Sequence, residues 1–235
     1  MRALITRPAE DAKSLHAELR RRGIAVTHEP MLTIERMTDV TVDMTGVQGL
    51  LFTSSNGVRA FARLSDHRDL PAFAVGDATA QACRDAGFLN VHSASGDVDA
   101  LANYVIRHCQ PYDGRLLQVA GTVSAGDLSG ALRAAGFTVD RIPIYEAHAA
   151  EALSSGTRTA MKNGRIDAVL FFSPRTASTF VTLAQSANLE NACRNINAYC
   201  LSPAVAKRAA ALPWKRVTIA AEPTQAALLA SLDTS

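Results

Sequence analysis

Short apolar runs alternate along the chain with stretches whose apolar residues recur at helical spacing. Residues 2–30 read as strand, loop, helix, glycine and strand, and residues 115–143 repeat that order without a gap. Gly23 and its equivalent Gly136 suit the left-handed backbone conformation that ends many helices. The pattern therefore predicts two copies of one unit.

Two further pairs of segments repeat in the same way. Residues 50–61 and 169–180 each read as a buried strand, a few small polar residues and a helix that reaches a phenylalanine. Residues 72–88 and 198–214 each read as a short apolar strand, a small-residue turn and an alanine-rich helix. Alternating strands and helices favour parallel sheets with helices on both faces. We therefore predict an α/β fold of two similar lobes, each a parallel sheet flanked by helices.

Two stretches break the alternation of strands and helices. We expect residues 28–37 and 140–149 to be extended, each with a proline and without a following helix. Such stretches suit chain crossings between the two lobes, near residues 30–37 and 142–149.

Composition narrows the class of protein. The chain has 235 residues, 48% of them hydrophobic, and 24 basic against 22 acidic side chains leave a formal charge of only +2. Proteins that follow a nucleic acid backbone carry a denser basic patch, so we expect no nucleic acid partner. Its four cysteines lack metal-binding spacing, so we expect reduced thiols and no metal.

Targeting signals do not stand out in the sequence. Met1 leads directly into a predicted strand, without the charged and apolar regions of a secretory leader. No apolar run reaches the roughly 18 residues of a membrane span. We therefore expect a cytoplasmic protein without membrane contact.

Four loop-to-helix turns carry candidate anion-binding residues. Ligands of parallel sheets gather at the carboxyl ends of the strands, where helix N-termini offer backbone N–H groups and partial positive charge. Clustered around one cleft between the lobes, these turns would suit a ligand with several carboxylates. Serine, threonine, asparagine and aspartate are also ordinary helix caps, so each turn alone has a purely structural alternative. The candidates are Thr53, Ser54, Ser55, Asn56 and Gly57; Gly76, Asp77 and Thr79; Ser173, Pro174, Arg175 and Thr176; and Ser202 and Pro203.

Two more polar residues lie at predicted strand and helix ends. Arg7 ends the first strand just before Pro8 and either pairs with a ligand carboxylate or is simply solvated. Thr224 precedes the last predicted helix and either only caps it or also faces the ligand.

Familiar catalytic motifs are missing from the sequence. It contains no G-x-G-x-x-G, H-E-x-x-H or G-x-S-x-G motif and no convincing pair of acid and base carboxylates. Residues 121–127 have the glycine spacing of a P-loop, but Asp127 replaces the lysine and would repel phosphate. We therefore expect no cofactor.

The ordered set of motifs resembles the uroporphyrinogen-III synthase family over nearly the whole chain. Each motif alone is a short strand, turn and helix, and the specificity lies in their order. The motifs are LITRP, P-x-L-x-I from Pro30, LLFTSSNGV, AVGDATA, PIYEA, LFFSPRTASTF, LSPAVA and EPTQAALL. The resemblance implies two α/β lobes joined by a two-stranded linker, one lobe comprising residues 1–35 and 146–235 and the other residues 36–145.

The resemblance also implies an activity. Family members cyclise hydroxymethylbilane, a linear tetrapyrrole polycarboxylate, with loss of water and inversion of ring D, and give uroporphyrinogen III. The substrate's own pyrroles supply the nucleophile, so neither metal nor cofactor is implied. We expect a monomer that makes transient contact with hydroxymethylbilane synthase.

Two positions take their interpretation from the family. Tyr145 lies in the second crossing, where the family's tyrosine lies near the cleft and helps water leave the substrate; the alternative is an aromatic residue that only packs the hinge. Gly121 is equivalent to a substrate-binding glycine beside which family members often carry an arginine. Residues 119–124 contain none, so one carboxylate partner is expected to be missing.

Two other classes of protein fit the same alternation of strands and helices. One is a non-catalytic two-lobed protein that binds a small anion or a tetrapyrrole. The other is a flavodoxin-like or receiver module, but a receiver needs an acidic cluster where this chain has Thr6, Arg7 and Pro8. The order of the motifs favours the synthase.

Overall fold

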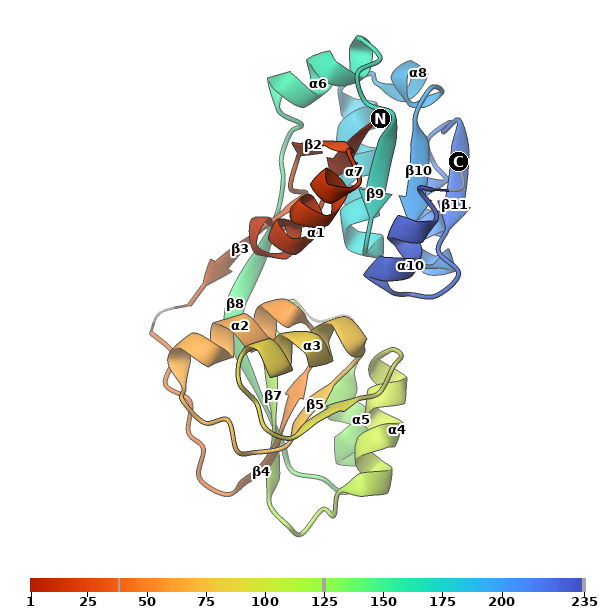
Figure 1. Cartoon of the computed structure of the whole chain (residues 1–235). Helices are drawn as coiled ribbons and strands as arrows, with labels where there is room; N and C mark the ends of the chain where they lie inside the picture. Colours follow the sequence, from red (N-terminus) through yellow and green to blue (C-terminus); the bar gives the residue numbers. More distant parts are fainter. Residues whose placement is uncertain (38, 124–125, 234–235) are drawn as a thin grey trace. The chain divides into compact units, whose positions relative to one another are not determined.

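The computed structural model describes residues 1–37, 39–123 and 126–233 (Figure 1). The chain divides into two compact units, Met1–Thr33 with His148–Ser235, and Ile34–Ala147. The sequence-based boundaries, after residues 35 and 145, lie two residues from these.

The first unit is built on a five-stranded sheet in the order β11-β10-β9-β1-β2, and every pair of neighbours is parallel. Helices connect the strands along the chain. The elements are β1 (Arg2–Ile5), α1 (Ala9–Arg21), β2 (Ala25–His28), α6 (Ser155–Lys162), β9 (Ala168–Phe171), α7 (Pro174–Ser186), α8 (Glu190–Cys193), β10 (Asn197–Cys200), α9 (Pro203–Ala209), β11 (Arg216–Ile219) and α10 (Gln225–Ala230).

The second unit contains most of a six-stranded sheet in the order β3-β8-β7-β4-β5-β6. Its elements are β3 (Leu32–Arg36), β4 (Val47–Phe52), α2 (Ser55–Leu64), β5 (Ala72–Ala74), α3 (Asp77–Asp85), β6 (Val91–Ser93), α4 (Val98–His108), β7 (Arg115–Gly121), α5 (Leu128–Ala134) and β8 (Val139–Ala149). The predicted α/β fold of parallel sheets with flanking helices is confirmed.

One edge of this sheet departs from the parallel arrangement. The Met37 N–H donates to the Ile144 oxygen and the Ala150 N–H to the Met31 oxygen, so β3 and β8 run antiparallel. The chain passes from one unit to the other within these two strands. The extended conformation predicted for both crossings is confirmed.

The first unit buries apolar side chains on both faces of its sheet. Within β9, Val169 and Phe171 join the core beneath α7 and α9, whereas Ala168 and Leu170 join the core beneath α1 and α10. A strand buried on both faces reads as a continuous apolar run, which is why residues 168–171 carry no polar side chain.

The second unit has the same layered core. Phe52 on β4 packs edge-on against Phe61 of α2 and against Phe88, with ring centroids 5.9 and 5.5 Å apart. The opposite face is covered by α4 and α5, whose Leu101 and Leu132 are fully buried.

Helix ends follow the sequence in some places and depart from it in others. Gly23 and Gly136 adopt φ of +70° and +91° just after α1 and α5, as predicted for helix-ending glycines. The prediction that no helix follows the second crossing was wrong, because α6 begins at Ser155. Only Thr157 and Met161 of α6 are buried, so its sequence lacks a wide apolar stripe.

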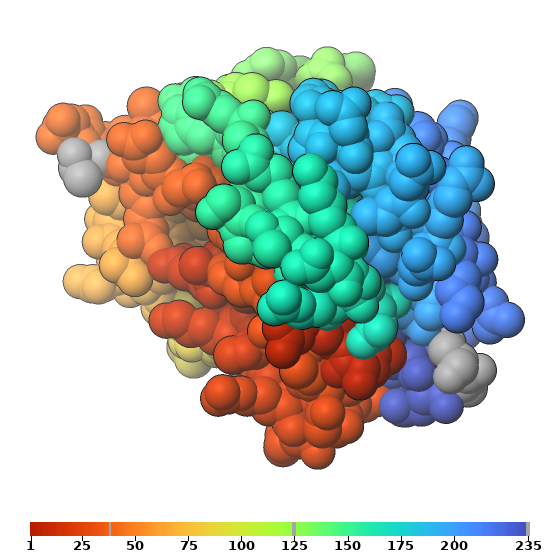
Figure 2. Space-filling model, turned by 90° about the horizontal axis from the view of Figure 1, so that it is seen from above, coloured from red at the N-terminus to blue at the C-terminus, as the bar shows by residue number. Residues whose placement is uncertain are grey.

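Buried Glu29 explains how α6 begins. Its carboxylate accepts hydrogen bonds from the Ser154 N–H at 2.9 Å, from the Ser154 hydroxyl at 2.6 Å and from the Thr157 hydroxyl. A carboxylate is favoured at a helix N-terminus, so this contact fixes the first turn of α6. Figure 2 shows the surfaces of α6 and α8 side by side in this unit.

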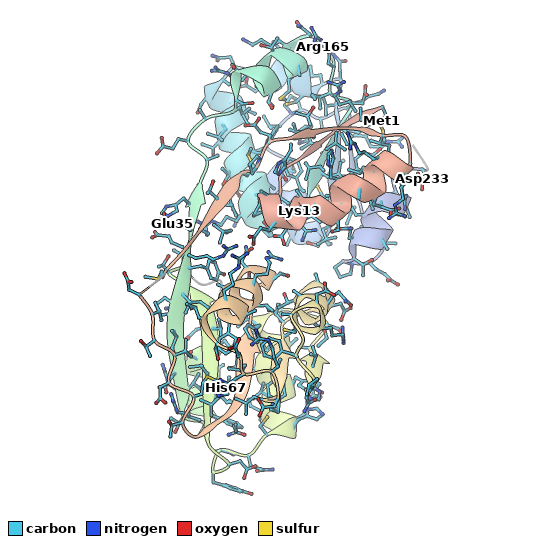
Figure 3. All side chains as sticks on the ribbon, turned by 60° about the vertical axis from the view of Figure 1, so that its left-hand side comes forward. Met1, Lys13, Glu35, His67, Arg165 and Asp233 are labelled. Carbon is cyan, nitrogen blue, oxygen red and sulfur yellow. The ribbon has the colours of Figure 1, made fainter. Side chains whose placement is uncertain are left out.

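Arg22 ties α10 to the end of α1. Its Nη1 donates to the Leu229 carbonyl at 3.1 Å and to Asp233 at 2.9 Å, while its Nε donates to Glu18 at 3.0 Å. Asp233 is labelled in Figure 3, beyond the end of α10. A guanidinium beside the last carbonyls of a helix offsets their partial negative charge.

The described residues include no helix with both the length and the apolar character needed to cross a membrane.

Three thiols are fully buried. Burial raises the pKa of Cys83, Cys193 and Cys200 from an ordinary 9.0 to about 12. Cys109, which is partly exposed, has its pKa raised as well, mainly by burial. All four are free cysteines.

We predict that replacing Cys200 with alanine flattens the alkaline dependence of stability. Because the pKa of Cys200 is higher in the folded than in the unfolded protein, the unfolded thiol ionises first as pH rises. The free energy of unfolding is therefore unaffected by this thiol below about pH 9 and decreases as pH rises towards 12. Urea unfolding at several pH values measures the free energy of unfolding against pH. Between these pH values it should fall more steeply for the wild type than for Cys200→Ala, by a slope that corresponds to about one proton. Equal slopes would contradict the prediction, and Cys109→Ala provides a less buried control.

Candidate functional site

Parallel pairing brings the polar turns of the second unit together at one edge of its sheet. Phe52, near the end of β4, is in register with Ala74 of β5 and with Val119 of β7. The segments that follow these strands therefore start side by side. They contain the predicted residues of the first two turns, and Gly121 is the last residue of β7 itself.

Tyr145 of β8 packs against two glycines at this edge. A Cβ atom added to Gly121 would lie 2.8 Å from Cε2 of the tyrosine ring, and one added to Gly57 would lie 3.7 Å from Cε1. The ring is buried, and 8% of the residue's surface is exposed. Because Gly121 has no side chain, the ring can lie directly against the backbone.

The ring of Tyr145 is fixed by packing, whereas its hydroxyl is not fixed by a hydrogen bond to the described residues. It forms no hydrogen bond to any residue within 1–37, 39–123 or 126–233, and it does not belong to the buried polar atoms that lack a partner. The phenol is therefore fixed through its ring while its O–H can still donate to a ligand.

A bulge in the β7–β8 pair sets the position of this tyrosine. Ala120 pairs with Pro143, but the next residue, Gly121, pairs with Tyr145, so Ile144 is the extra residue. Proline has no N–H to donate and is tolerated inside a sheet mainly at such irregular points. Bulges re-aim the side chains beside them, which here places Tyr145 over Gly121.

The turn before α2 contains a helix cap, and α2 itself carries an arginine that the sequence analysis missed. The Ser54 hydroxyl accepts from the Asn56 N–H at 3.1 Å, so the capping interpretation of Ser54 is confirmed. Asn56 Oδ1 accepts from Arg59 Nη2 at 2.6 Å, and the Ser55 hydroxyl donates to the Ala78 carbonyl at 3.3 Å. The guanidinium of Arg59 thus lies beside the first turn of α2. The three-residue spacing of Asn56 and Arg59 was the available signal.

The turn before α3 is the least suited to an anion. Asp77 is the first residue of α3 and accepts hydrogen bonds from the hydroxyls of Ser93 at 2.6 Å and Ser95 at 3.1 Å. Its negative charge already occupies the region that the helix N-terminus makes favourable for anions. Gly76 supplies no side-chain cap, and Thr79 is buried.

A strand neighbour brings an arginine to the end of β7. Arg141 of β8 donates through Nη2 to the Gly121 carbonyl at 2.5 Å and to the Thr122 carbonyl at 3.1 Å. Residues 119–124 themselves contain no arginine, and the expectation of a missing carboxylate partner there stays a prediction; residue 124 lies outside the described residues. Asp127 caps α5 by accepting from the Gly130 N–H at 2.9 Å.

Arg7 contacts three segments of the first unit, namely α10, the residue after β9 and the first turn of α1. Its Nη1 donates to Gln225 Oε1 at 3.0 Å, its guanidinium carbon lies 4.5 Å from the centre of the Phe172 ring, and its Nη2 is 4.0 Å from Asp11. Only 19% of the side chain is exposed. The alternative that Arg7 is simply solvated was wrong.

The remaining candidates of the first unit are helix caps or stand next to caps. Hydroxyls of Ser173, Ser202 and Thr224 accept from the backbone N–H groups of Thr176, Val205 and Ala227 at 3.2, 3.4 and 3.1 Å. Pro174 and Pro203 begin α7 and α9 and have no N–H to offer a ligand. Arg175 is exposed, whereas Thr176 is buried. A role of these residues in ligand binding stays a prediction.

We predict that Gly121→Ala destabilises the protein by about 1–3 kcal/mol, because the new methyl group overlaps the Tyr145 ring. Urea unfolding measures the loss. In a Tyr145→Ala background the same substitution should cost much less, because the overlapping ring is gone. Gly156→Ala in α6 is the control, since the nearest atom lies 4.0 Å away and alanine favours a helix. Equal costs in both backgrounds would refute the packing argument.

Known proteins of one family resemble this chain in sequence and in fold. A family model described as uroporphyrinogen-III synthase HemD matches residues 13–230. A protein of Ruminiclostridium josui named porphyrin biosynthesis protein HemD is 22% identical over 221 residues, which cover 88% of this chain and 43% of that protein. The chain thus spans less than half the length of this relative.

Two solved structures share the fold. Uroporphyrinogen-III synthetase from Helicobacter pylori is 17% identical, is covered over 100% of both chains and has a TM-score of 0.67. A mutant uroporphyrinogen III synthase from Thermus thermophilus is 16% identical, with 100% of this chain and 98% of that chain covered and a TM-score of 0.57. Since the family model covers most of its length, the chain belongs to the uroporphyrinogen-III synthase family.

Proposed function

We propose that this protein is a uroporphyrinogen-III synthase, which closes hydroxymethylbilane with loss of water and inversion of ring D. The observation that carries the proposal is the family match over residues 13–230. The geometry around Tyr145 supports it, because a rigidly packed phenol with an available hydroxyl suits the loss of water from a bound substrate.

The proposed chemistry asks little of acid and base side chains. The pyrroles of the substrate supply the nucleophile and push out the leaving group, so the protein's task is to fold the tetrapyrrole and stabilise developing charge. In this proposal, Tyr145 donates its O–H to the departing hydroxyl of ring A. Burial of its ring limits the directions in which that donor can point.

Substrate carboxylates need cationic partners, and we assign this role to residues at the carboxyl edges of the two sheets. Arg7 offers a partly exposed guanidinium in the first unit. Arg59 and Arg141 place guanidinium groups beside the α2 turn and at the end of β7 in the second. Guanidinium groups match carboxylates in shape and hydrogen bonding, so these three residues support recognition of a polycarboxylate.

Other aspects of the proposal stand on the sequence and family resemblance. They are a monomeric state, a cytoplasmic location and transient contact with hydroxymethylbilane synthase.

The activity is tested by a coupled assay. Hydroxymethylbilane is generated by its own synthase, this protein is added, and the products are oxidised and separated by chromatography. We expect the type III isomer to dominate in proportion to added protein, whereas unaided substrate closes to type I. Exclusive formation of type I would refute the synthase and favour a non-catalytic tetrapyrrole binder.

Tyr145→Phe tests the assigned donor. We expect kcat to fall by about 100-fold while KM changes little, because the hydroxyl acts on the leaving group and not on binding. Thermal unfolding should show a folded variant, since the ring and its contacts with Gly121 stay in place. An unchanged kcat would remove Tyr145 from the mechanism.

A further inference from the structure

A groove lies in the first unit at the edge where the strands of its sheet begin. It has a volume of about 400 Å³ and is lined by the segment from the last turn of α6 to β9 and by the segment from the end of α7 to β10. These segments lead into neighbouring strands that begin in register, because Asn197 of β10 pairs with Ala168 of β9. The candidate residues described above follow the strands at their carboxyl ends, so the groove is at the opposite edge of the sheet.

The floor of this groove is apolar. Met161, Ile166, Leu189 and Ile196 line it, and each of them exposes at most 2% of its surface. All four belong to the core beneath α7 and α9, so packing holds them in place. An apolar floor with a few polar groups around it is typical of sites that bind small organic molecules.

Three asparagines provide neutral polar groups around the floor. Asn188, Asn191 and Asn195 line the groove and are exposed, and their side chains form no hydrogen bond to any residue that the structure describes. The backbone of Asn188 accounts for its identity, because its φ of +52° is a conformation that asparagine tolerates. Asn191 has no such reason, since it lies within α8 and asparagine is a poor helix former. An amide offers a donor and an acceptor together, which matches the edge of adenine.

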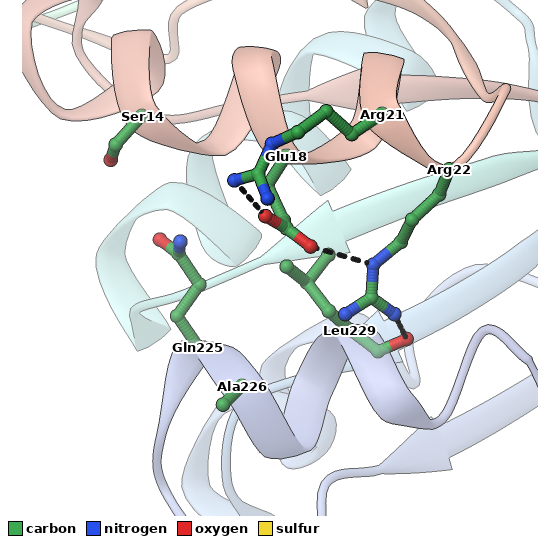
Figure 4. Close-up of a pocket in the computed structure, with 7 residues that line it drawn as sticks. All are labelled: Ser14, Glu18, Arg21, Arg22, Gln225, Ala226 and Leu229. Carbon is green, nitrogen blue, oxygen red and sulfur yellow. Dashed lines mark hydrogen bonds and ion pairs between the residues drawn. The ribbon is translucent and has the colours of Figure 1, made fainter.

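Three cations surround the same groove. Lys162 lines it, Arg165 lies between two lining residues, and Arg194 comes directly before one (Figure 3). All three are exposed, and none forms an ion pair with a described residue. In the groove between α1 and α10, by contrast, both arginines contact Glu18 (Figure 4). Lysine and arginine bind phosphate groups through charge-assisted hydrogen bonds, and here no ion pair has to break first.

A carboxylate completes the lining. Asp167 accepts the Arg2 N–H at 2.6 Å through Oδ2, while its Oδ1 accepts no hydrogen bond from the described part of the chain. Carboxylates beside nucleotide sites commonly accept hydrogen bonds from ribose hydroxyls. The groove thus offers amides for a base, a carboxylate for a sugar and cations for phosphates.

We propose that this groove is a further binding site, which takes an adenine nucleoside polyphosphate. The asparagine amides bind the edge of the base, Asp167 accepts from the ribose, and Lys162 with the two neighbouring arginines neutralises the phosphates. The site goes beyond the proposed synthase activity, because it lies at the other edge of the sheet and takes part in no step of that reaction.

Isothermal titration calorimetry of the full chain with ATP, in the absence of Mg²⁺, tests the proposal. We expect ATP to bind with a Kd below about 1 mM. Inorganic triphosphate lacks the base and should bind about tenfold more weakly. GTP should bind about fivefold more weakly, because guanine presents two acceptors where adenine presents a donor and an acceptor. Equal affinity for ATP and triphosphate would show general attraction of anions and overturn the proposal, as would a lack of ATP binding.

Two variants separate recognition of the phosphates from recognition of the base. Lys162→Met should weaken the binding of ATP and GTP alike, by about tenfold, because it removes one cation. Asn191→Ala should weaken the binding of ATP alone, by about fivefold, and so abolish the preference over GTP. Unchanged ATP affinity in both variants would overturn the proposal.

Lys207→Met is the matched control. It removes the same charge from an exposed lysine that, like Lys162, lies in the last turn of a helix, but in α9 and outside the groove. We expect its affinity for ATP to match that of the wild type, and a loss equal to that of Lys162→Met would overturn the proposal. These titrations need no synthase activity. A protein that binds ATP as expected but forms only the type I product would keep this site and lose the proposed function.

Discussion

Parallel pairing of strands is the constraint on which the other features depend. In a parallel sheet every strand ends at the same edge, so each connection must return along a face of the sheet, usually as a helix. The turns that lead into these helices consequently collect at one edge of each unit. Segments as distant along the chain as Arg7 and Gln225 meet there at 3.0 Å. Polar groups that no local pattern connects are thereby brought within hydrogen-bonding distance.

A glycine also lets an aromatic ring approach the backbone of a strand closely. Gly121 lets the Tyr145 ring lie on the backbone of β7, and the bulge at Ile144 turns that ring towards it. Pro143 fits because the ladder is already irregular at this point. The tyrosine is therefore positioned by rigid strands and not by a loop, which suits a group that must aim a single hydroxyl.

Much of the fold could be read from the sequence, because the repeated units carry strong local signals. Gly23 and Gly136 end their helices, and Ser54, Ser173, Ser202 and Thr224 cap theirs. Helix α6 was missed because it buries few residues and because its first turn is held by hydrogen bonds to Glu29, which is distant in sequence. Arg141 at Gly121 and Gln225 at Arg7 were missed for the same reason: strand register and sheet order decide these partners, and neither is visible as spacing along the chain.

The position of β1 has a consequence for the order in which the chain can fold during synthesis. This strand pairs with β2 on one side and with β9 on the other, and β9 begins only at Ala168. The ribosome therefore delivers the whole continuous unit, residues 34–147, before the N-terminal strand can complete its sheet. Until then the buried face of α1, with Leu15 and Leu19, lacks most of its apolar partners. Apolar surface of the N-terminal segment thus stays uncovered while translation proceeds, which is the condition under which chains aggregate.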